Sequence, residues 1–369
     1  MKLYIGGDVS PTECTSSGFA SGDVASLFGS VAELVKDGEC FIVNLECAVT
    51  DKDTPIRKMG PNLRAPIETA ATLKSAGVTV AGLSNNHVFD YGMPGFDDTK
   101  RYLSEAGIAF TGEGPTEQAA RVPLFLRIGG KTLALICVCE HEYSYALPHR
   151  EGSWAFDPFE TMEDVSQARH DSDFVIVLYH GGKEQCEVPS PRLRKACRAL
   201  VRAGADLVLC QHSHCIGSEE TYLDKRIVYG QGNFHFVKNT AHPHWCSGLL
   251  LELELTPTGP VFTWHPVVPT PTGITLAEGV RREEILDGFA QRSAWLQDGT
   301  WLEKWHEFCE GERDYYTRAI TGNLADMFPE MPVEQLHQFF PHFLDCEAHE
   351  DVWHELFPSW HGEGTDEVL

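Results

Sequence analysis

The chain has 369 residues, 42% of them hydrophobic, and a formal net charge of −25 from 29 basic and 54 acidic residues. This acidity argues against a nucleic acid as the main partner, because neutralising phosphates requires a basic face. No apolar run approaches the ~20 residues that span a bilayer. The N-terminus lacks the pattern of a signal peptide, so we expect a cytoplasmic protein, unless part of the natural chain has been removed.

Short apolar, β-rich runs alternate with segments of helical spacing over about the first 255 residues. The spacing predicts helices at 23–36, 67–76, 96–106, 159–169 and 192–203. It predicts strands at 3–5, 41–43, 78–83, 124–128, 132–138, 174–178, 206–209, 227–229 and 249–255, with a hairpin between the fourth and fifth of them. Strands that alternate with helices indicate a layered α/β architecture with some antiparallel pairing.

The character of the sequence changes after about residue 257. Prolines cluster between 257 and 271, and beyond residue 278 the chain is predicted to be helical, with aromatic residues at helical spacing. Such a stripe most often packs against a core. We therefore predict one domain over residues 1–256 and a mostly helical C-terminal extension over 257–369, packed on the core or on a protein partner.

Five of the apolar runs end in side chains that can bind metal ions. A lone Asp there is usually a cap or turn residue, and a lone His is usually satisfied locally. In α/β folds, however, the carboxyl ends of parallel strands share one rim, where ligands bind. The joint pattern therefore predicts a divalent-metal site, and its ligand chemistry suits Zn, Mn or Fe. The residues are Asp8, Glu46, Asn86, His87, Asp90, His180, His212 and His214.

The same stretches carry a family resemblance. They are GDVS, NLECAVT, LSNNHVFDYGMPGFDDT, YHGGKE, AGADLVLCQHSH and IVYGQGNFHF, in that order. Over about residues 1–255 the chain resembles the bacterial capsule-synthesis protein CapA (poly-γ-glutamate biosynthesis) family, which has a calcineurin-like metallophosphoesterase fold. The resemblance implies a layered α/β/β/α sandwich, here followed by the helical appendage.

The resemblance also implies roles for individual residues. One or two divalent ions (Mn, Zn or Fe) would be held by Asp8, Glu46, Asn86, His180, His212 and His214. His87 would act as general acid or as a stabiliser of the transition state, and Asp90 would orient it. The first phosphoesterase motif is Asp-x-His, but Ser10 stands in place of that His. Binding of a single metal ion, or an altered second site, therefore remains open.

Two basic residues of the loop 51–66, Lys58 and Arg64, resemble substrate-binding positions of the family. They would hold a phosphate or carboxylate; the alternative is that they are solvated loop charges. We predict a metal-dependent hydrolase that acts on an anionic small molecule or polymer. One alternative is a non-catalytic accessory factor in the assembly of an anionic polymer such as poly-γ-glutamate or capsule. Another is a γ-glutamyl peptide hydrolase.

Overall fold

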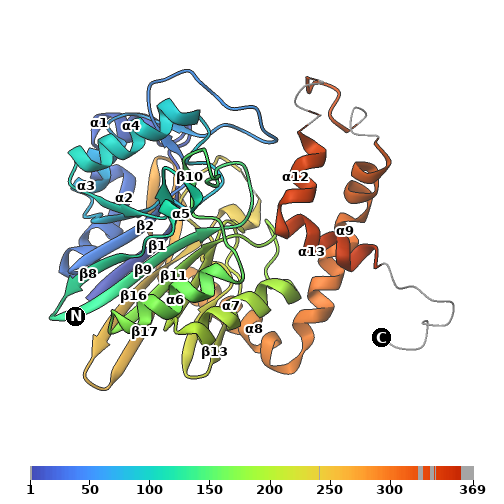
Figure 1. Ribbon diagram of the computed structural model, residues 1–369. Helices are drawn as coiled ribbons and strands as arrows, with labels where there is room; N and C mark the ends of the chain where they lie inside the picture. Colours follow the sequence, from blue (N-terminus) through green and yellow to red (C-terminus); the bar gives the residue numbers. More distant parts are fainter. Residues whose placement is uncertain (1, 241, 323–326, 333–335, 337, 359–369) are drawn as a thin grey trace.

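Two β-sheets lie face to face in the computed structural model, and helices cover their outer faces (Figure 1). The structure describes residues 2–240, 242–322, 327–332, 336 and 338–358. The C-terminal helices form a group beside one end of the sheets, with α12 and α13 nearest to the loops of the sandwich.

The first sheet has the strand order β18-β17-β16-β1-β2-β5-β6, and β15 (Asn233–His235) also pairs with β1. Four neighbouring strands run parallel: β1 (Lys2–Val9), β2 (Cys40–Leu45), β5 (Val80–Gly82) and β6 (Ala109–Thr111) at the edge. Antiparallel strands complete it: β16 (Gly248–Thr256), β17 (Gly259–Thr270) and β18 (Gly273–Leu276).

The second sheet has the strand order β13-β14-β12-β11-β9-β8. Four strands are parallel: β9 (Lys131–Cys139), β11 (Phe174–His180), β12 (Leu207–Gln211) and β14 (Lys225–Val228). The edges are antiparallel, formed by β8 (Leu124–Ile128) and β13 (Glu219–Tyr222). β8 and β9 form the predicted hairpin. Two short pairs lie in loops: β3 (Ala48–Val49) with β4 (Arg64–Ala65), and β7 (Glu113–Gly114) with β10 (Gly152–Ser153).

Alternate residues of the central strands face different hydrophobic cores. In β11, Ile176 and Leu178 pack between the two sheets, whereas Val175 and Val177 pack under the helices outside the second sheet. A strand buried on both faces needs an unbroken apolar run, as the sequence has here. The predicted layered α/β/β/α sandwich with a C-terminal helical appendage is therefore confirmed.

The helices divide between the two outer faces. The first sheet is covered by α1 (Ser16–Ser21), α2 (Val24–Leu34), α3 (Thr69–Ser75) and α4 (Gly92–Glu105). The second sheet is covered by α6 (Glu160–His170), α7 (Pro191–Ala203) and part of the C-terminal group. That group contains α8 (Gly279–Asp298), α9 (Thr300–Thr321), α12 (Phe339–Asp345) and α13 (Glu347–Leu356). The short helices are α5 (Glu117–Ala120), η1 (Val35–Asp37) and η2 (Pro243–Trp245).

The sheet continues past residue 257, where we placed the start of the helical extension. β17 and β18 add to the first sheet, and the helices begin at Gly279. The prolines that suggested a boundary are tolerated because Pro260 lies where only β16 flanks β17, and Pro269 where only β18 does. A strand position with one open side does not need its N–H in the ladder. Division of the chain into two domains stays a prediction. Among the described residues, none of the helices combines the length and apolarity needed to cross a bilayer.

Glu220 of β13 ties α7 to the second sheet. Its carboxylate accepts hydrogen bonds from Arg194 Nη2 (3.0 Å), from the Arg198 guanidinium and from the Tyr229 hydroxyl (2.6 Å). Burial opposes ionisation, but these donors lower the pKa of Glu220 to about 2. Because this is below the unfolded-state value, the stabilisation is present above about pH 4.5 and is lost as the pH falls towards 2.

We predict that Glu220→Gln makes the free energy of unfolding less sensitive to acid. In urea denaturation between about pH 5 and about pH 2.5, the wild type should lose more stability than the variant. The matched control is Glu254→Gln, at an exposed position of β16. Parallel pH profiles for wild type and Glu220→Gln would contradict the prediction.

Candidate metal centre

Two groups of candidate metal ligands meet at the carboxyl ends of the central strands. One group is Glu46, His180 and His212, and the other is Asp8, Glu46 and His214; within each, the ligand atoms lie within 4.8 Å of one another. Asp8 lies in β1, Glu46 follows β2, His180 ends β11, and the other two histidines follow β12. The structure thus brings five of the six predicted ligands together, from strands of both sheets.

Carboxamide side chains hold this cluster in place. Asn86 Oδ1, the sixth predicted ligand, lies 3.0 Å from His180 Nε2. Asn44, at the end of β2, donates from Nδ2 to Asp8 Oδ1 (2.7 Å) and lies 3.1 Å from His180 Nδ1. Both ring nitrogens of His180 therefore have partners, which fix the plane of the imidazole. The sequence placed Asn44 at a strand end but gave it no role.

His212 and His214 share an unusual backbone conformation. Their φ angles are 88° and 54°, in the left-handed region, which costs a non-glycine residue about 1–3 kcal/mol. The His212 N–H donates to Asp8 Oδ2 (3.0 Å), and His214 Nδ1 lies 3.0 Å from Asn233 Oδ1. These contacts hold the turn after β12 so that both rings reach the cluster.

Glu46 is the side chain whose surroundings best fit a metal ion. It is fully buried, and within the described residues neither carboxylate oxygen has a hydrogen-bond partner. His180 Nε2 lies 3.5 Å from Oε1, an ion-pair distance. A buried carboxylate without hydrogen bonds is costly unless a cation compensates it. Glu46 also belongs to both ligand groups, and carboxylate, imidazole and carboxamide donors suit Zn, Mn or Fe.

The electrostatics of the cluster favour an ionised Asp8 beside a protonated His180 when no cation is bound. Burial raises the pKa of Asp8, but the contact with His180 and the charge of His214 outweigh burial and lower the pKa to about 2. Burial lowers the pKa of His180, but its contacts with Asp8 and Glu46 raise the pKa to about 10. The cluster therefore attracts positive charge.

The predicted catalytic pair adjoins this cluster. His87 Nδ1 lies 2.6 Å from Asp90 Oδ2, and Lys58 Nζ donates to Asp90 Oδ1 at 2.6 Å. Lys58 Nζ also lies 3.1 Å from His87 Nδ1. All three side chains are buried or nearly so. Asp90 therefore holds Nδ1 of the imidazole, and Nε2 is the nitrogen that can exchange a proton with a cavity ligand.

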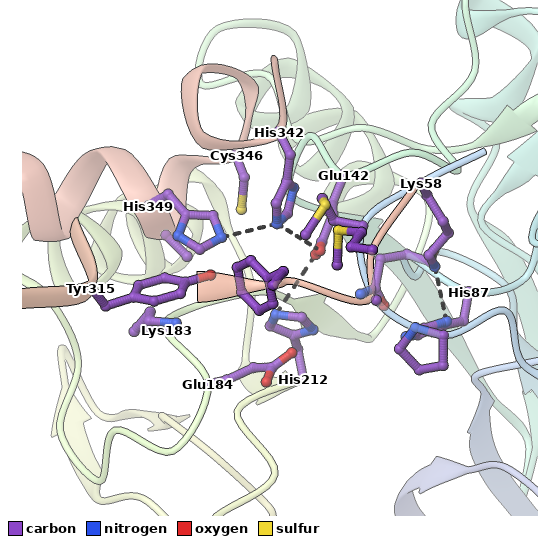
Figure 2. Close-up of a pocket in the computed structure, with 17 residues that line it drawn as sticks. Lys58, His87, Glu142, Lys183, Glu184, His212, Tyr315, His342, Cys346 and His349 are labelled. Atoms are coloured by element: carbon purple, nitrogen blue, oxygen red, sulfur yellow. Dashed lines mark hydrogen bonds and ion pairs between the residues drawn. The ribbon is translucent and has the colours of Figure 1, made fainter. Parts of the chain in front are cut away.

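A cavity of about 320 Å³ opens beside these residues, and Figure 2 shows its lining. Asn86, His87, His212 and Lys58 contribute to its wall. Arg64, the other predicted substrate contact, does not line it. Its Nη1 donates to the Lys52 carbonyl (3.0 Å), and the side chain lies among exposed residues of the β3–β4 loop. Substrate binding by Arg64 stays a prediction that this cavity does not support.

Glu142 is a cavity residue that sequence reasoning missed. It lies in the loop after β9, where Oε2 is 3.8 Å from His212 Nε2 and Oε1 is 3.7 Å from His342 Nε2. Burial opposes its ionisation, but the electrostatic influence of His342, His212 and Lys58 holds the pKa of Glu142 well below its usual range. A signal was present, because Glu140 and Glu142 follow the apolar run 132–138 as other acidic residues follow other strands.

The C-terminal helices also reach the cavity. His342 of α12 and His349 of α13 lie on one side of it, with Nε2 atoms 3.0 Å apart, and Tyr315 of α9 lies next to them (Figure 2). Lys183 and Glu184, three and four residues after His180, also line the cavity; Figure 2 shows Lys183 near Tyr315 and Glu184 near His212. Nothing local in the sequence distinguishes these histidines from other residues of an amphipathic helix.

Comparison with known proteins gives the chain a family. Residues 2–238 match the family described as bacterial capsule synthesis protein PGA_cap. Among curated proteins, the "Capsule biosynthesis protein CapA" of Bacillus anthracis is 31% identical over 219 residues, 57% of this chain and 53% of that protein. The "PGA biosynthesis protein CapA" of Bacillus subtilis is 28% identical over 57% of each chain. The alignments thus span about half the length of these relatives.

Two more distant similarities complete the comparison. A Mycobacterium tuberculosis protein named "Probable polyglutamine synthesis accessory protein" is 27% identical over 52% of this chain and 54% of its own. A 5'-nucleotidase precursor from Thermus thermophilus superposes over 79% of this chain and 58% of its own, with 13% identity and a TM-score of 0.44, too weak a likeness to bear on function. The match over residues 2–238 decides the matter: this chain belongs to the bacterial capsule synthesis protein PGA_cap family.

Proposed function

We propose that the protein is a metal-dependent hydrolase of the phosphoesterase type. The observation that carries the proposal is Glu46, a buried carboxylate without a hydrogen-bond partner among the described residues, shared by both groups of candidate ligands. Its burial is hard to explain structurally, since a neutral side chain would fill the same space without the cost of desolvating a charge. A centre that holds divalent cations explains it.

The candidate ligands divide between two positions. Asp8 and His214 would hold one ion, Glu46 would serve both, and Asn86, His180 and His212 would favour the other, as the two groups of ligand atoms allow. Bound divalent ions would supply positive charge to a phosphoryl oxygen and a water of lowered pKa. Mn, Zn or Fe suits this donor set.

His87 would complete the reaction. In phosphoester hydrolysis, the oxygen of water forms a bond to phosphorus, the bond to the leaving oxygen breaks, and that oxygen needs a proton. His87 faces the cavity, and Asp90 holds its Nδ1, so Nε2 would deliver this proton. Lys58 binds the same carboxylate and keeps Asp90 in position.

The test compares turnover with metal content. Purified protein loaded with Mn²⁺ or Zn²⁺ should hydrolyse a generic phosphomonoester or phosphodiester, and a chelator should abolish that activity. Poly-γ-glutamate is assayed beside them, because release of glutamate from it would indicate a γ-glutamyl peptide hydrolase instead. Stoichiometric metal binding without turnover of any substrate would overturn the hydrolase proposal.

One observation favours a second candidate, a non-catalytic accessory factor in the assembly of an anionic polymer. Ser10 replaces the histidine of the first phosphoesterase motif, and its buried hydroxyl has no hydrogen-bond partner within the described part of the chain. A serine hydroxyl is a weaker metal ligand than imidazole, so one ion would be held less tightly. The names of the relatives, which refer to biosynthesis and to an accessory role, agree with this candidate.

A further inference from the structure

The C-terminal helices form a wall of the candidate active cavity, although they lie outside the family match, which ends at residue 238. Figure 2 shows His342 in the cavity lining, between His349 on its own side and Glu142 of the sandwich. Tyr315 comes from α9, and Phe328 and Met331 come from the segment 327–332. The cavity is therefore completed by residues that the family pattern does not contain.

This wall is anchored by buried polar contacts. Asp351 of α13 accepts hydrogen bonds from Arg192 Nε (2.9 Å) and Ser190 Oγ (2.6 Å) at the start of α7. The Arg192 guanidinium also binds Glu140, whose Oε2 accepts from the Gly182 N–H (3.1 Å). Gly182 lies in the loop after β11, two residues beyond His180, and Glu140 lies in the loop after β9, two residues before Glu142. The wall is thus tied to two loops that border the cavity.

A second contact fixes α13 to the loop after β9. Glu347 accepts from the His141 N–H at 2.8 Å and lies 2.8 Å from His141 Nδ1. The Tyr145 hydroxyl donates to Asp345, at the end of α12, at 2.6 Å. These hydrogen bonds, together with those of Asp351, hold α12 and α13 against the loops that border the cavity.

The chemistry of the wall is neutral. Among the described lining residues, the segment beyond residue 278 contributes aromatic, aliphatic, sulfur-containing and imidazole side chains and no Lys, Arg, Asp or Glu. Burial lowers the pKa of His342 and His349, which keeps both rings uncharged at neutral pH. The charged lining residues, such as Lys58, Lys183 and Glu184, come from the sandwich. A cavity lined by neutral side chains of the C-terminal segment and charged side chains of the sandwich fits a ligand with one anionic end and one uncharged end.

The size of the cavity points the same way. Its volume of about 320 Å³ is near the lower limit of roughly 300–1,000 Å³ for small-molecule sites. A neighbouring hollow of about 270 Å³ also has Glu142 and His342 in its lining, so these two side chains lie between the two spaces. An extended polymer would need a continuous groove through that point.

We propose that the substrate is a small phosphomonoester whose uncharged organic group packs on the wall formed by Tyr315, Phe328 and Met331, and that a polyanion such as poly-γ-glutamate is not the ligand of this cavity. This inference rests on the proposed function, because the phosphate end is placed at the candidate metal centre. The substrate class therefore differs from the polymer named for the relatives of this chain.

The test measures binding and not turnover. Full-length protein loaded with Mn²⁺ is titrated by calorimetry with inorganic phosphate, with phenylphosphonate and with a γ-linked glutamate oligomer. We expect phenylphosphonate to bind about tenfold more tightly than inorganic phosphate, because its ring is buried against the wall. The glutamate oligomer should bind more weakly than phenylphosphonate.

Variants locate the contact. Phe328→Ala combined with Met331→Ala should bring the affinities for phenylphosphonate and phosphate to within about twofold of each other, with phosphate binding unchanged. Leu344→Ala, at a half-exposed position of α12 outside the cavity lining, is the matched control and should keep the preference. The readout is the ratio of two affinities in one protein, so a variant that fails to fold is recognised by its loss of phosphate binding. In that case the affinities of the wild type for the three ligands still test the inference.

Several results would overturn the inference. They are equal wild-type affinities for phosphate and phenylphosphonate, no binding of either, equal weakening of both in the double variant, and tighter binding of the glutamate oligomer. A phenylphosphonate preference without turnover would instead leave the inference standing and overturn the hydrolase proposal. Turnover of a phosphoester without a preference for phenylphosphonate would support the hydrolase proposal and overturn the inference.

Discussion

His87→Ala is expected to lower kcat by about 10²–10⁴-fold for any phosphoester that the metal-loaded protein hydrolyses. The substitution removes the proton donor but leaves the candidate ligands untouched, so metal content should not change. Steady-state kinetics together with elemental analysis of the same preparation measure both quantities. Asp90→Asn should also lower kcat. A carboxylate contacts His87 Nδ1 with one oxygen and Lys58 Nζ with the other, whereas an amide has one oxygen and no charge to balance Lys58.

The matched control for His87→Ala is His149→Ala, which removes an exposed imidazole. It should leave kcat within about twofold of wild type, as surface substitutions usually do. Loss of metal together with activity in His87→Ala would show that this residue acts on metal binding and would contradict the assigned role. Unchanged kcat would exclude it as the proton donor.

Glu46→Gln is expected to remove most of the stabilisation that metal binding gives to the fold. For the wild type, metal at about a hundred times its Kd should raise the free energy of unfolding by about 2.7 kcal/mol. The variant should gain much less, because one substitution removes a charged ligand from both groups. Without metal, the two proteins should differ much less in stability, because the substitution removes the cost of burying a carboxylate but also removes its ion pair with His180 (3.5 Å).

Urea denaturation with Mn²⁺ and with a chelator gives all four free energies in the Glu46 experiment. Glu39→Gln serves as the control, because Glu39 is an exposed carboxylate directly before the same strand, β2. It should behave like the wild type in both conditions. If metal stabilises Glu46→Gln as much as the wild type, metal binding does not depend on Glu46. The burial of its carboxylate without a hydrogen-bond partner among the described residues would then have another cause.

Much of the candidate centre follows from local sequence. An apolar run that ends in Asp8, Glu46 or His180 marks the end of a buried strand, and parallel strands bring their carboxyl ends to one edge. This rule needs only the order of the elements. It also applies to Glu142, which stands just after the strand β9 and was overlooked because acidic residues are common in a chain of charge −25.

Other parts of the structure do not follow from local sequence. His342 reaches the cavity because α12 and α13 dock on the loops after β9 and before α7 through contacts such as that of Asp351 with Arg192. Such docking joins residues 159 positions apart, and helical periodicity carries no information about it. Arg64 illustrates a different difficulty, since the direction of a basic loop residue cannot be predicted from its neighbours in sequence. The pairing of β3 with β4 places it on the surface instead.

The origin of the candidate ligands in both sheets has a mechanical consequence. Asp8 and Glu46 come from one sheet, and His180, His212 and His214 come from the other. A cation bound by these side chains would link the two sheets at the carboxyl ends of their parallel strands, where the hydrophobic core ends and the polar loops begin. Removal of the cation would weaken the contact between the two sheets at this end first. The geometry of the candidate site and the packing of the two sheets against each other would therefore depend on the same cation.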